Sequence, residues 1–347
     1  MSKFFNLLSL LVYMGMGSVF VFASTGKTKE YSLKSGVVIY SIEGGGLLAK
    51  DLNLTIVGEG KLRFKAWGKI ALVEEQIEES TSGAFENTEK FIRCIKYDKH
   101  QQFNVNYDKE VILERPIPRG RGVQDLTKDM LPHGSEIIAG RVCELWAKEG
   151  TRVCLYEGIP LLVEKELFGI SFEKKALWIE ENSDVETDQC SIPNFPIRKI
   201  ALFKTTIQQK RGISEVSTHL SEILDEVSKK SSLDIERHKQ YYLNRIGEPI
   251  FEREKILLPQ ILESMKYARE CLQKAGDRSE ANECIEMLKR LKAVHFSEKE
   301  GAVDVWDRKE KNRILEYFDE NITMLEAKMK CIRAAKNISD LSGCMRQ

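Results

Sequence analysis

Eight cysteines, four of them in a repeated spacing, constrain this chain more than any other feature. Cys271 and Cys284 form a Cys-x12-Cys pair, and Cys331 and Cys344 repeat it sixty positions later. An even number of cysteines in an exported chain is typical of disulfide bonds rather than buried free thiols. The repeat therefore predicts a structure that is cross-linked twice in the same way.

The residues around the repeated cysteines also match. The matched pairs are Leu262 and Ile322, Met265 and Leu325, Ala275 and Ala335, Asp277 and Asn337, and Ser279 and Ser339. Asp, Asn and Ser are common helix caps, so each unit is predicted to be a helix, a tight capped turn and a shorter helix. We expect disulfides Cys271–Cys284 and Cys331–Cys344, each closing one hairpin. The alternative is a bridge between repeats, such as Cys271–Cys331.

The remaining cysteines belong to the first part of the chain. A four-residue loop, Ala147-Lys148-Glu149-Gly150, would place position 146 opposite 151 and Cys143 opposite Cys154, at a distance that suits a disulfide. A register shifted by two residues would make these cysteines diagonal neighbours on one face. Cys94 and Cys190 are left to pair with each other or to stay free.

Residues 1–23 have the features of a secretory signal peptide. Lys3 precedes the apolar stretch from Phe4 to Phe22, and Val21 and Ala23 fit the small-residue rule for cleavage before Ser24. The stretch is also long enough for an uncleaved membrane anchor. Cleavage is the preferred interpretation, and no later segment is apolar enough to span a membrane.

Charge and motif content exclude several classes of function. Lys plus Arg and Asp plus Glu number 53 each, which gives no basic surface for nucleic acid. The cysteines form no CxxC pair and the five histidines do not cluster near them, so the sequence predicts neither a metal site nor a cofactor. No GxSxG motif is present, so catalytic residues are not predicted.

Residues 24–210 are predicted to form a β domain, because short segments with strand periodicity follow one another with turn signals between them. Gly44-Gly45-Gly46 is expected to end the first strand, and Gly58-Glu59-Gly60 to form a hairpin turn. A short helix is expected over Gln124–Leu131. The expected strands are Val37–Ile42, Leu52–Val57, Lys61–Trp67, Ile70–Ile77, Phe91–Tyr97, Gln102–Tyr107, Val111–Leu113, Gly140–Ala147, Arg152–Tyr156 and Leu167–Ile179.

Residues 211–347 are predicted to form an α-helical domain, because apolar residues recur there at helical spacing. The segments begin at Val216, Ile256 and Ile314. Such stripes usually pack against other helices, and a face that binds a partner or a membrane surface is the alternative. The predicted fold class is α+β: a curved antiparallel sheet or incomplete β-barrel, followed by a helical domain stapled by disulfides.

Two groups of charged residues are candidate sites. Arg115, Arg119 and Arg121 lie in a Pro/Gly-rich loop, which could bind an anion or lipid headgroup, because arginine grips phosphate and carboxylate with paired donors. A solvated loop is the alternative. The acidic pairs Glu74-Glu75 and Glu78-Glu79 are expected to lie at a solvent-exposed edge rather than to act as catalysts.

Parts of the β region resemble a known family. The residues that carry the resemblance are Phe91–Lys99, Gln102–Tyr107, Ile138–Trp146, Cys154–Leu161 and Ile192–Ile197. Over about residues 30–200 this order of parts resembles the periplasmic LolA/LolB-like family and related DUF4412-type domains. The resemblance implies an incomplete β-barrel whose concave face can hold acyl chains, and a carrier or sensor of hydrophobic ligands in the cell envelope.

The functional hypothesis follows from these points. The chain is expected to be an exported, periplasmic, non-enzymatic protein that binds an apolar ligand or a lipidated partner in the half-barrel. The alternative is an interaction module that binds an envelope protein through the stapled helices. An uncharacterised hydrolase is the weakest candidate.

Overall fold

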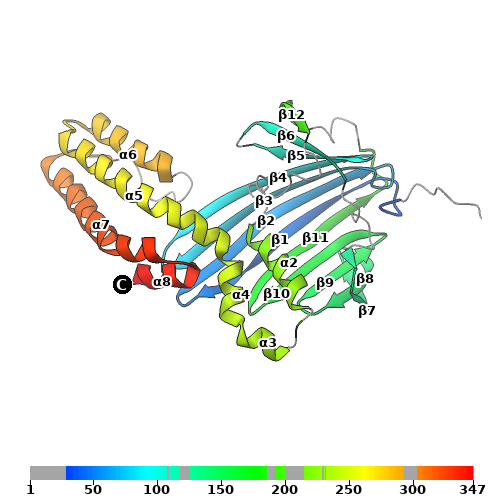
Figure 1. Ribbon diagram of the computed structural model, residues 1–347. Coiled ribbons are helices and arrows are strands. Elements are labelled where there is room, and N and C mark those ends of the chain that lie inside the picture. Colours follow the sequence, from blue (N-terminus) through cyan, green and yellow to red (C-terminus); the bar gives the residue numbers. More distant parts are fainter. Residues whose placement is uncertain are drawn as a thin grey trace, which may run out of the picture.

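The protein is a large open β-sheet followed by a helical region, as the computed structural model shows (Figure 1). The structure describes residues 29–107, 109–117, 126–185, 192–199, 215–228, 230, 232–292 and 303–346. The predicted fold class is therefore confirmed. The expected signal peptide, residues 1–23, lies outside the described residues, and the division into domains at residue 210 stays a prediction.

Twelve described strands form one sheet in the order β12-β6-β5-β4-β3-β2-β1-β11-β10-β9-β8-β7. Adjacent strands are antiparallel, except that β12 runs parallel to β6. The strands are β1 (Gly36–Ala49), β2 (Leu52–Lys65), β3 (Ile70–Gly83), β4 (Asn87–Asp98), β5 (Gln101–Asn106), β6 (Val111–Pro116), β7 (Leu131–Ile138), β8 (Arg141–Lys148), β9 (Thr151–Tyr156), β10 (Ile159–Leu167), β11 (Ile170–Glu181) and β12 (Ile197–Lys199).

Glycine clusters lie inside the long strands and do not end them, so two sequence predictions were wrong. β1 continues through Gly44-Gly45-Gly46, and β2 continues through Gly58-Glu59-Gly60 without a hairpin turn. Gly45 has φ +132°, and a Cβ atom there would lie 2.2 Å from the Leu54 carbonyl oxygen. Glycine thus permits a close approach and a bend that a side chain would prevent.

Other strand predictions were right in place but inexact in extent. The β4–β5 hairpin around Asp98-Lys99-His100 is confirmed. Strands β7 and β10 were not predicted, and the expected strand from Leu167 to Ile179 contains the turn between β10 and β11. The helix expected over 124–131 lies partly outside the described residues, and its predicted end was wrong because β7 begins at Leu131.

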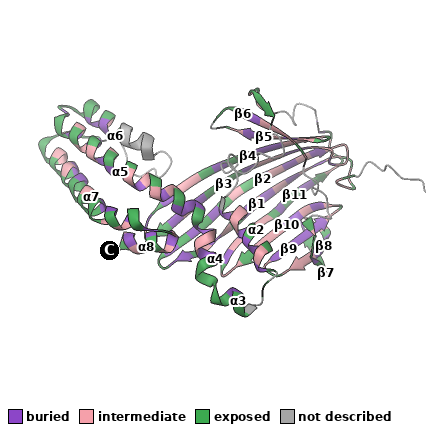
Figure 2. Ribbon diagram, viewed as in Figure 1, coloured by how far each residue is buried: buried purple, intermediate pink, exposed green. Residues whose placement is uncertain are grey.

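The sheet has one face that the helices cover and one that they do not. Along β1, Val38, Tyr40 and Ile42 are buried, whereas the residues between them are more exposed (Figure 2). This period of two is that of a strand with one face packed. The face that carries Val38, Tyr40 and Ile42 is called the inner face below.

The helical region contributes its own elements. The described helices are α2 (Glu215–Val227), α3 (Ser232–Arg237), α4 (Lys239–Ile246), α5 (Glu248–Lys274), α6 (Arg278–Lys292), α7 (Arg308–Ala334) and α8 (Ile338–Arg346). Helices α2, α4 and α8 pack on the sheet, while the far ends of α5 and α7 extend away from it with α6 (Figure 1). The largest apolar cluster combines sheet residues such as Ile42 and Leu52 with Leu220, Ile246 and Leu341 of the helices.

Three disulfides join described cysteines: Cys143–Cys154, Cys271–Cys284 and Cys331–Cys344. They are the pairs expected from the sequence. The β8–β9 register differs from the expected one, however, because Lys148 pairs with Thr151 across a two-residue turn and Cys154 faces Leu145. Glu149-Gly150 suffices to reverse the chain, so the bridged cysteines are diagonal rather than opposed, with Cα atoms 5.4 Å apart.

Candidate functional site

A cluster of charged residues lies in the middle of the inner face. Glu75 of β3 accepts one hydrogen bond from Lys174 Nζ at 2.5 Å and another from Arg93 Nη1 at 2.9 Å, one on each carboxylate oxygen. Lys174 Nζ also lies 4.3 Å from the centroid of the Tyr40 ring. Four strands thus contribute to one polar group, here called the inner-face cluster: Tyr40, Glu75, Arg93 and Lys174.

A glycine lies between Lys174 and Glu75 in the sheet. Lys174 is on β11 and Glu75 on β3, and the side chains of both pass next to Gly60 of β2. A Cβ atom at Gly60 would lie 3.4 Å from Glu75 Cγ and 3.6 Å from Lys174 Cε. These are ordinary van der Waals distances, so position 60 has room for a small side chain, and the lysine spans two strands to reach the carboxylate.

The charges of the cluster are fixed by their neighbours. Burial alone would raise the pKa of Glu75, but Lys174 and Arg93 overcome this effect and lower that pKa to about 2. Burial raises the pKa of Tyr40 well above its ordinary value, and its hydroxyl donates to the Pro160 carbonyl. Glu75 is therefore ionised and Tyr40 neutral at physiological pH.

Access to the cluster is unequal among its members. The Glu75 side chain is 6% exposed, whereas those of Lys174 and Arg93 are 20% and 28% exposed. The carboxylate thus lies beneath the two cations, and the accessible part of the cluster is positive.

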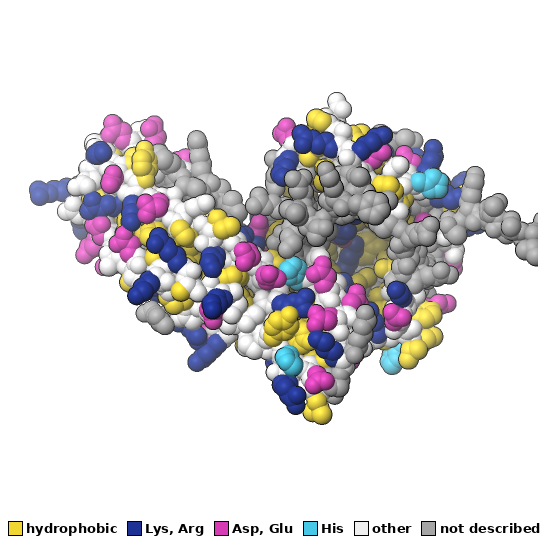
Figure 3. All heavy atoms as spheres, in the orientation of Figure 1, with side chains coloured by type: hydrophobic (Ala, Val, Ile, Leu, Met, Phe, Trp, Pro, Cys, Tyr) yellow, Lys and Arg dark blue, Asp and Glu magenta, His cyan; other side chains and the backbone are white. Residues whose placement is uncertain are grey.

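The surroundings of the cluster are largely apolar. In register with it on the same face lie Val73, Ile95 and Tyr97, of which Val73 and Tyr97 are half-buried. Figure 3, which views the molecule from the side of α2, shows a hollow beside the helices with hydrophobic and basic side chains inside it. A half-buried polar group in an apolar hollow is typical of a small-molecule site.

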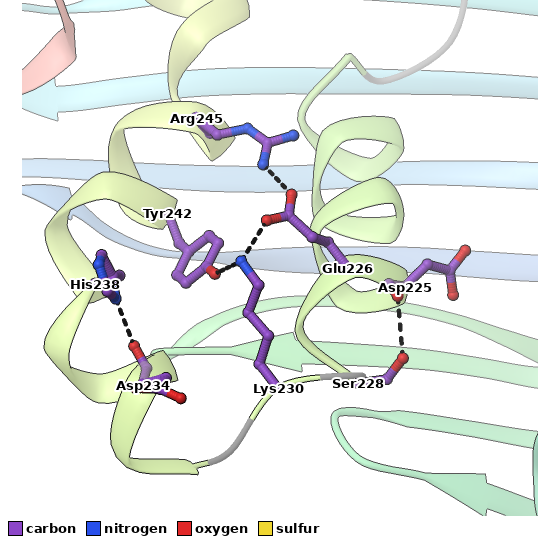
Figure 4. Close-up of polar contacts among 8 residues, drawn as sticks. All are labelled: Asp225, Glu226, Ser228, Lys230, Asp234, His238, Tyr242 and Arg245. Carbon is purple, nitrogen blue, oxygen red and sulfur yellow. Dashed lines mark hydrogen bonds and ion pairs between the residues drawn. The ribbon is translucent and has the colours of Figure 1, made fainter.

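Helices α2 and α4 cover one side of this face and are joined by ion pairs (Figure 4). Glu226 of α2 accepts from Arg245 of α4, and from Lys230 Nζ at 2.7 Å, which also donates to the Tyr242 hydroxyl at 2.8 Å. The bonds from Lys230 and Arg245 lower the pKa of Glu226. Tyr242 is buried against Phe168 of the sheet, so this network positions the cover.

Lys165 of β10 lies under α2. Its ammonium group donates to Ser221, and burial lowers its pKa to about 8, an effect that repulsion from Lys148 and Arg93 increases and Asp225 opposes. The inner face thus holds a further cation close enough to Arg93 to repel it.

A second buried polar group joins α5 to the sheet. Arg253 forms an ion pair with Glu89 of β4 and lies 3.5 Å from Glu254, which accepts a hydrogen bond from Asn87. Burial raises the pKa of Glu254 to about 7, although Arg253 and Asn87 oppose the shift. Glu254 is 2% exposed. This group fixes the start of α5.

The structure describes one of the three candidate arginines and one of the two remaining cysteines. Arg115 lies half-buried on β6, where burial and the nearby Arg93 lower its pKa and Tyr97 opposes the shift. Arg119 and Arg121 lie outside the described residues, as does Cys190. Cys94 is a buried free thiol next to Tyr107, and burial raises the pKa of this thiol.

The structure corrects the interpretation of the acidic pairs. Glu75 and Glu79 are 5% and 2% exposed and lie on the inner face, because they alternate in phase with the buried positions of β3, which runs on to Gly83. The inner-face cluster was missed for this reason. Its signal in the sequence is that Glu75 is in phase with the apolar positions Ala71 and Ile77.

One further cavity, of about 400 Å³, lies among the helices. Its lining residues are Tyr241, Asn244, Arg245, Glu248, Phe251, Glu252, Lys336 and Asn337. Near it, His219 Nδ1 lies 3.8 Å from Glu248 and 3.0 Å from the Arg245 carbonyl oxygen. These contacts tie α2 to α4 and α5, which is a structural role.

The described residues contain neither a candidate metal site nor a helix that could span a membrane. No group of three or more His, Cys, Asp or Glu among them is placed to hold a metal ion. None of the helices that the structure describes is long and apolar enough to cross a membrane.

Comparison with known proteins gives fold-level likenesses only. No protein family and no curated protein matches the sequence. Among solved structures, an uncharacterised conserved protein from Thermus thermophilus has 9% identity and a TM-score of 0.30, and the match covers 50% of this chain and 95% of that one. The Pseudomonas aeruginosa MucA/MucB complex matches with 13% identity and a TM-score of 0.26, covering 46% of this chain and 56% of that one.

A third likeness is to a putative outer membrane lipoprotein-sorting protein domain from Vibrio parahaemolyticus, with 10% identity and a TM-score of 0.21. That match covers 45% of this chain and 89% of that one. At these identities and TM-scores, none of the three identifies a function for this chain.

Proposed function

We propose that the chain is an exported, non-enzymatic protein that binds an apolar ligand, or the lipid of a lipidated partner, on the inner face of the sheet. The observation that carries this proposal is the inner face itself, where Val73, Ile95 and Tyr97 lie in register beside the inner-face cluster. The three disulfides suggest an oxidising compartment, for which we propose the periplasm.

The dimensions of the sheet suit such a ligand. β2 and β3 have 14 residues each, and a strand of this length extends for about 45 Å at roughly 3.3 Å per residue. Helices α2, α4 and α8 contact β1 and β10, and α5 packs on the end of β4 that holds Asn87 and Glu89. Among the described residues, the rest of the inner surface of β3 to β6 is therefore the part available for a ligand.

Native mass spectrometry and lipid extraction of the oxidised full chain, purified from its own exported fraction, test this function. We expect an acyl-chain ligand that is kept by Val57→Trp and lost in Val73→Trp. Val73 lies on the inner face, whereas Val57 is 55% exposed on the opposite face and serves as the matched control. A full chain that carries no ligand and binds no fluorescent fatty-acid probe would contradict the proposal.

A second candidate is an interaction module, which one observation favours. Tyr317 and Met324 of α7 are 48% and 53% exposed, and Tyr267 of α5 is 58% exposed. Exposed apolar residues on extended helices are common in partner-binding surfaces. A photo-crosslinking residue at position 324 should then capture one partner in the exported fraction, and one at the exposed Glu320 should capture less. Equal capture at both positions would contradict this candidate.

A further inference from the structure

The inner-face cluster has more positive charge than its carboxylate can balance. Lys174 and Arg93 share the single carboxylate of Glu75. Arg93 also repels Lys165 on one side and Arg115 on the other. Asp225 attracts Lys165, and Glu79 lies further along β3, so the unbalanced charge at the cluster itself comes from the two cations that share Glu75.

The positions of these charges make the excess accessible. Glu75 lies underneath, with each oxygen bonded to one cation, while Lys174 and Arg93 keep the larger exposed fractions. An ammonium group has three donors and a guanidinium group has five, so both cations have donors left for a second acceptor. Apolar residues of the same face, including Val73 and Ile95, lie directly alongside.

We infer that the inner face selects amphiphiles whose headgroup is anionic, a phosphate or carboxylate bound by Lys174 and Arg93, with the acyl chain lying along the inner strands. This inference rests on the proposed function and adds the chemical class of the ligand. Glu75 acts as an internal counterion that holds the two cations in place and lowers their affinity for the ligand.

Binding of the oxidised full chain to two lysolipids of identical acyl chain tests the inference, with both lipids kept below their critical micelle concentrations. Lysophosphatidylglycerol is anionic and lysophosphatidylcholine is zwitterionic. We expect the anionic lipid to bind about tenfold more tightly, because its headgroup has a net negative charge, whereas the quaternary ammonium group of the zwitterionic lipid is repelled by the same two cations. Glycerol 3-phosphate serves as the headgroup without a chain and should bind far more weakly than either lipid.

The variants give effects of opposite sign. Lys174→Gln should remove most of the preference for the anionic lipid, and Glu75→Gln should increase it. Lys175→Gln should change nothing, because Lys175 is the next residue on the same strand and faces the opposite side of the sheet. Misfolding would weaken binding in both inner-face variants, so a gain in Glu75→Gln cannot come from damage.

The outcomes separate the two proposals. Equal binding of both lipids overturns the inference and leaves the proposed function intact. Failure of both lipids to bind overturns the proposed function. Glycerol 3-phosphate binding as tightly as the anionic lipid overturns the role of the acyl chain, and the same loss in Lys174→Gln and Lys175→Gln overturns the role of the inner-face cluster.

Discussion

The two disulfide-linked hairpins have the same local geometry but different surroundings. In the first hairpin the Glu280 amide donates to Asp277 Oδ1 at 3.0 Å, and in the second the Asp340 amide donates to Asn337 Oδ1 at 2.9 Å. The Cα atoms of the bridged cysteines are 5.7 Å and 5.6 Å apart. Capping and spacing are therefore sufficient to specify the hairpin itself.

The two hairpins pack against different parts of the protein because side chains at a few corresponding positions differ. Ile338 at the start of α8 is fully buried, whereas its counterpart Arg278 at the start of α6 is exposed. Ser342 Oγ donates to the Lys50 carbonyl of the sheet at 2.8 Å, but its counterpart Asn282 bonds to Val303 within the helical region. The second hairpin belongs to the main core and the first to a smaller cluster of its own. The same motif can thus pack on the sheet or extend away from it, depending on the side chains that it presents to its surroundings.

The largest expected difference concerns Ile338. We expect Ile338→Ala to lower the free energy of unfolding by roughly 3 to 4 kcal/mol, because it leaves a cavity in the main core. Arg278→Ala should cost less than about 0.5 kcal/mol. Urea unfolding of both variants checks this, and similar losses would show that the hairpins are not different in the way described.

Removing one disulfide or the other should lower hydrogen-exchange protection in different parts of the protein. Each bridge closes a loop worth about 3 kcal/mol in the loop-entropy model. We expect Cys331→Ala/Cys344→Ala to lower hydrogen-exchange protection in α8 and in β1. Cys271→Ala/Cys284→Ala should lower it in α6 alone. Loss of protection in the sheet after removal of the first bridge would contradict this division.

The pH dependence of the folding stability should arise in the main core, at the start of α5. The pKa of Glu254 is raised to about 7 in the folded state, so the folded chain binds more protons than the unfolded chain between about pH 4.5 and 7. Stability should therefore fall as pH rises through this range, by on the order of 3 kcal/mol. Glu254→Gln should flatten the profile, and Glu252→Gln, at an exposed neighbour, should not.

The smallest expected effect is also the one that should be the same in both hairpins. Asp277→Ala and Asn337→Ala each remove a helix cap and should each cost about 1 kcal/mol. Thermal unfolding or hydrogen exchange at α6 and α8 measures the loss. A much larger cost for one cap would mean that the surroundings affect even the local motif.

Features encoded locally were predictable from the sequence. Cap residues, helical periodicity and the Cys-x12-Cys spacing act within a few turns of chain, so the helical hairpins followed from them. The extent of the sheet strands was not predictable, because glycine at positions 44–46 and 58 looks like a turn signal. Only the positions of neighbouring strands show that the chain approaches closely there instead.

The inner-face cluster was unpredictable for a related reason. Glu75, Arg93 and Lys174 come from three strands, and Lys174 reaches Glu75 past Gly60 and across two intervening strands. The local charge pattern indicated a solvent-exposed edge instead, because acidic side chains dominate the segment from Glu74 to Glu79. The register across four strands decides the matter, and no short segment contains it.

The contact between α8 and the first two strands has a consequence for the order of folding. Ser342 and Arg346 bind Lys50 and Asp51, nearly three hundred positions earlier in the chain. A chain that is synthesised from its N-terminal end presents β1 and β2 long before α8 is available. The apolar ends of these strands, including Leu48 and Leu52, then stay exposed to solvent until α8 is made. Contacts between residues so far apart in the sequence favour slow folding and aggregation. The topology therefore predicts that a chaperone which covers these strands until α8 is synthesised would increase the yield of folded protein.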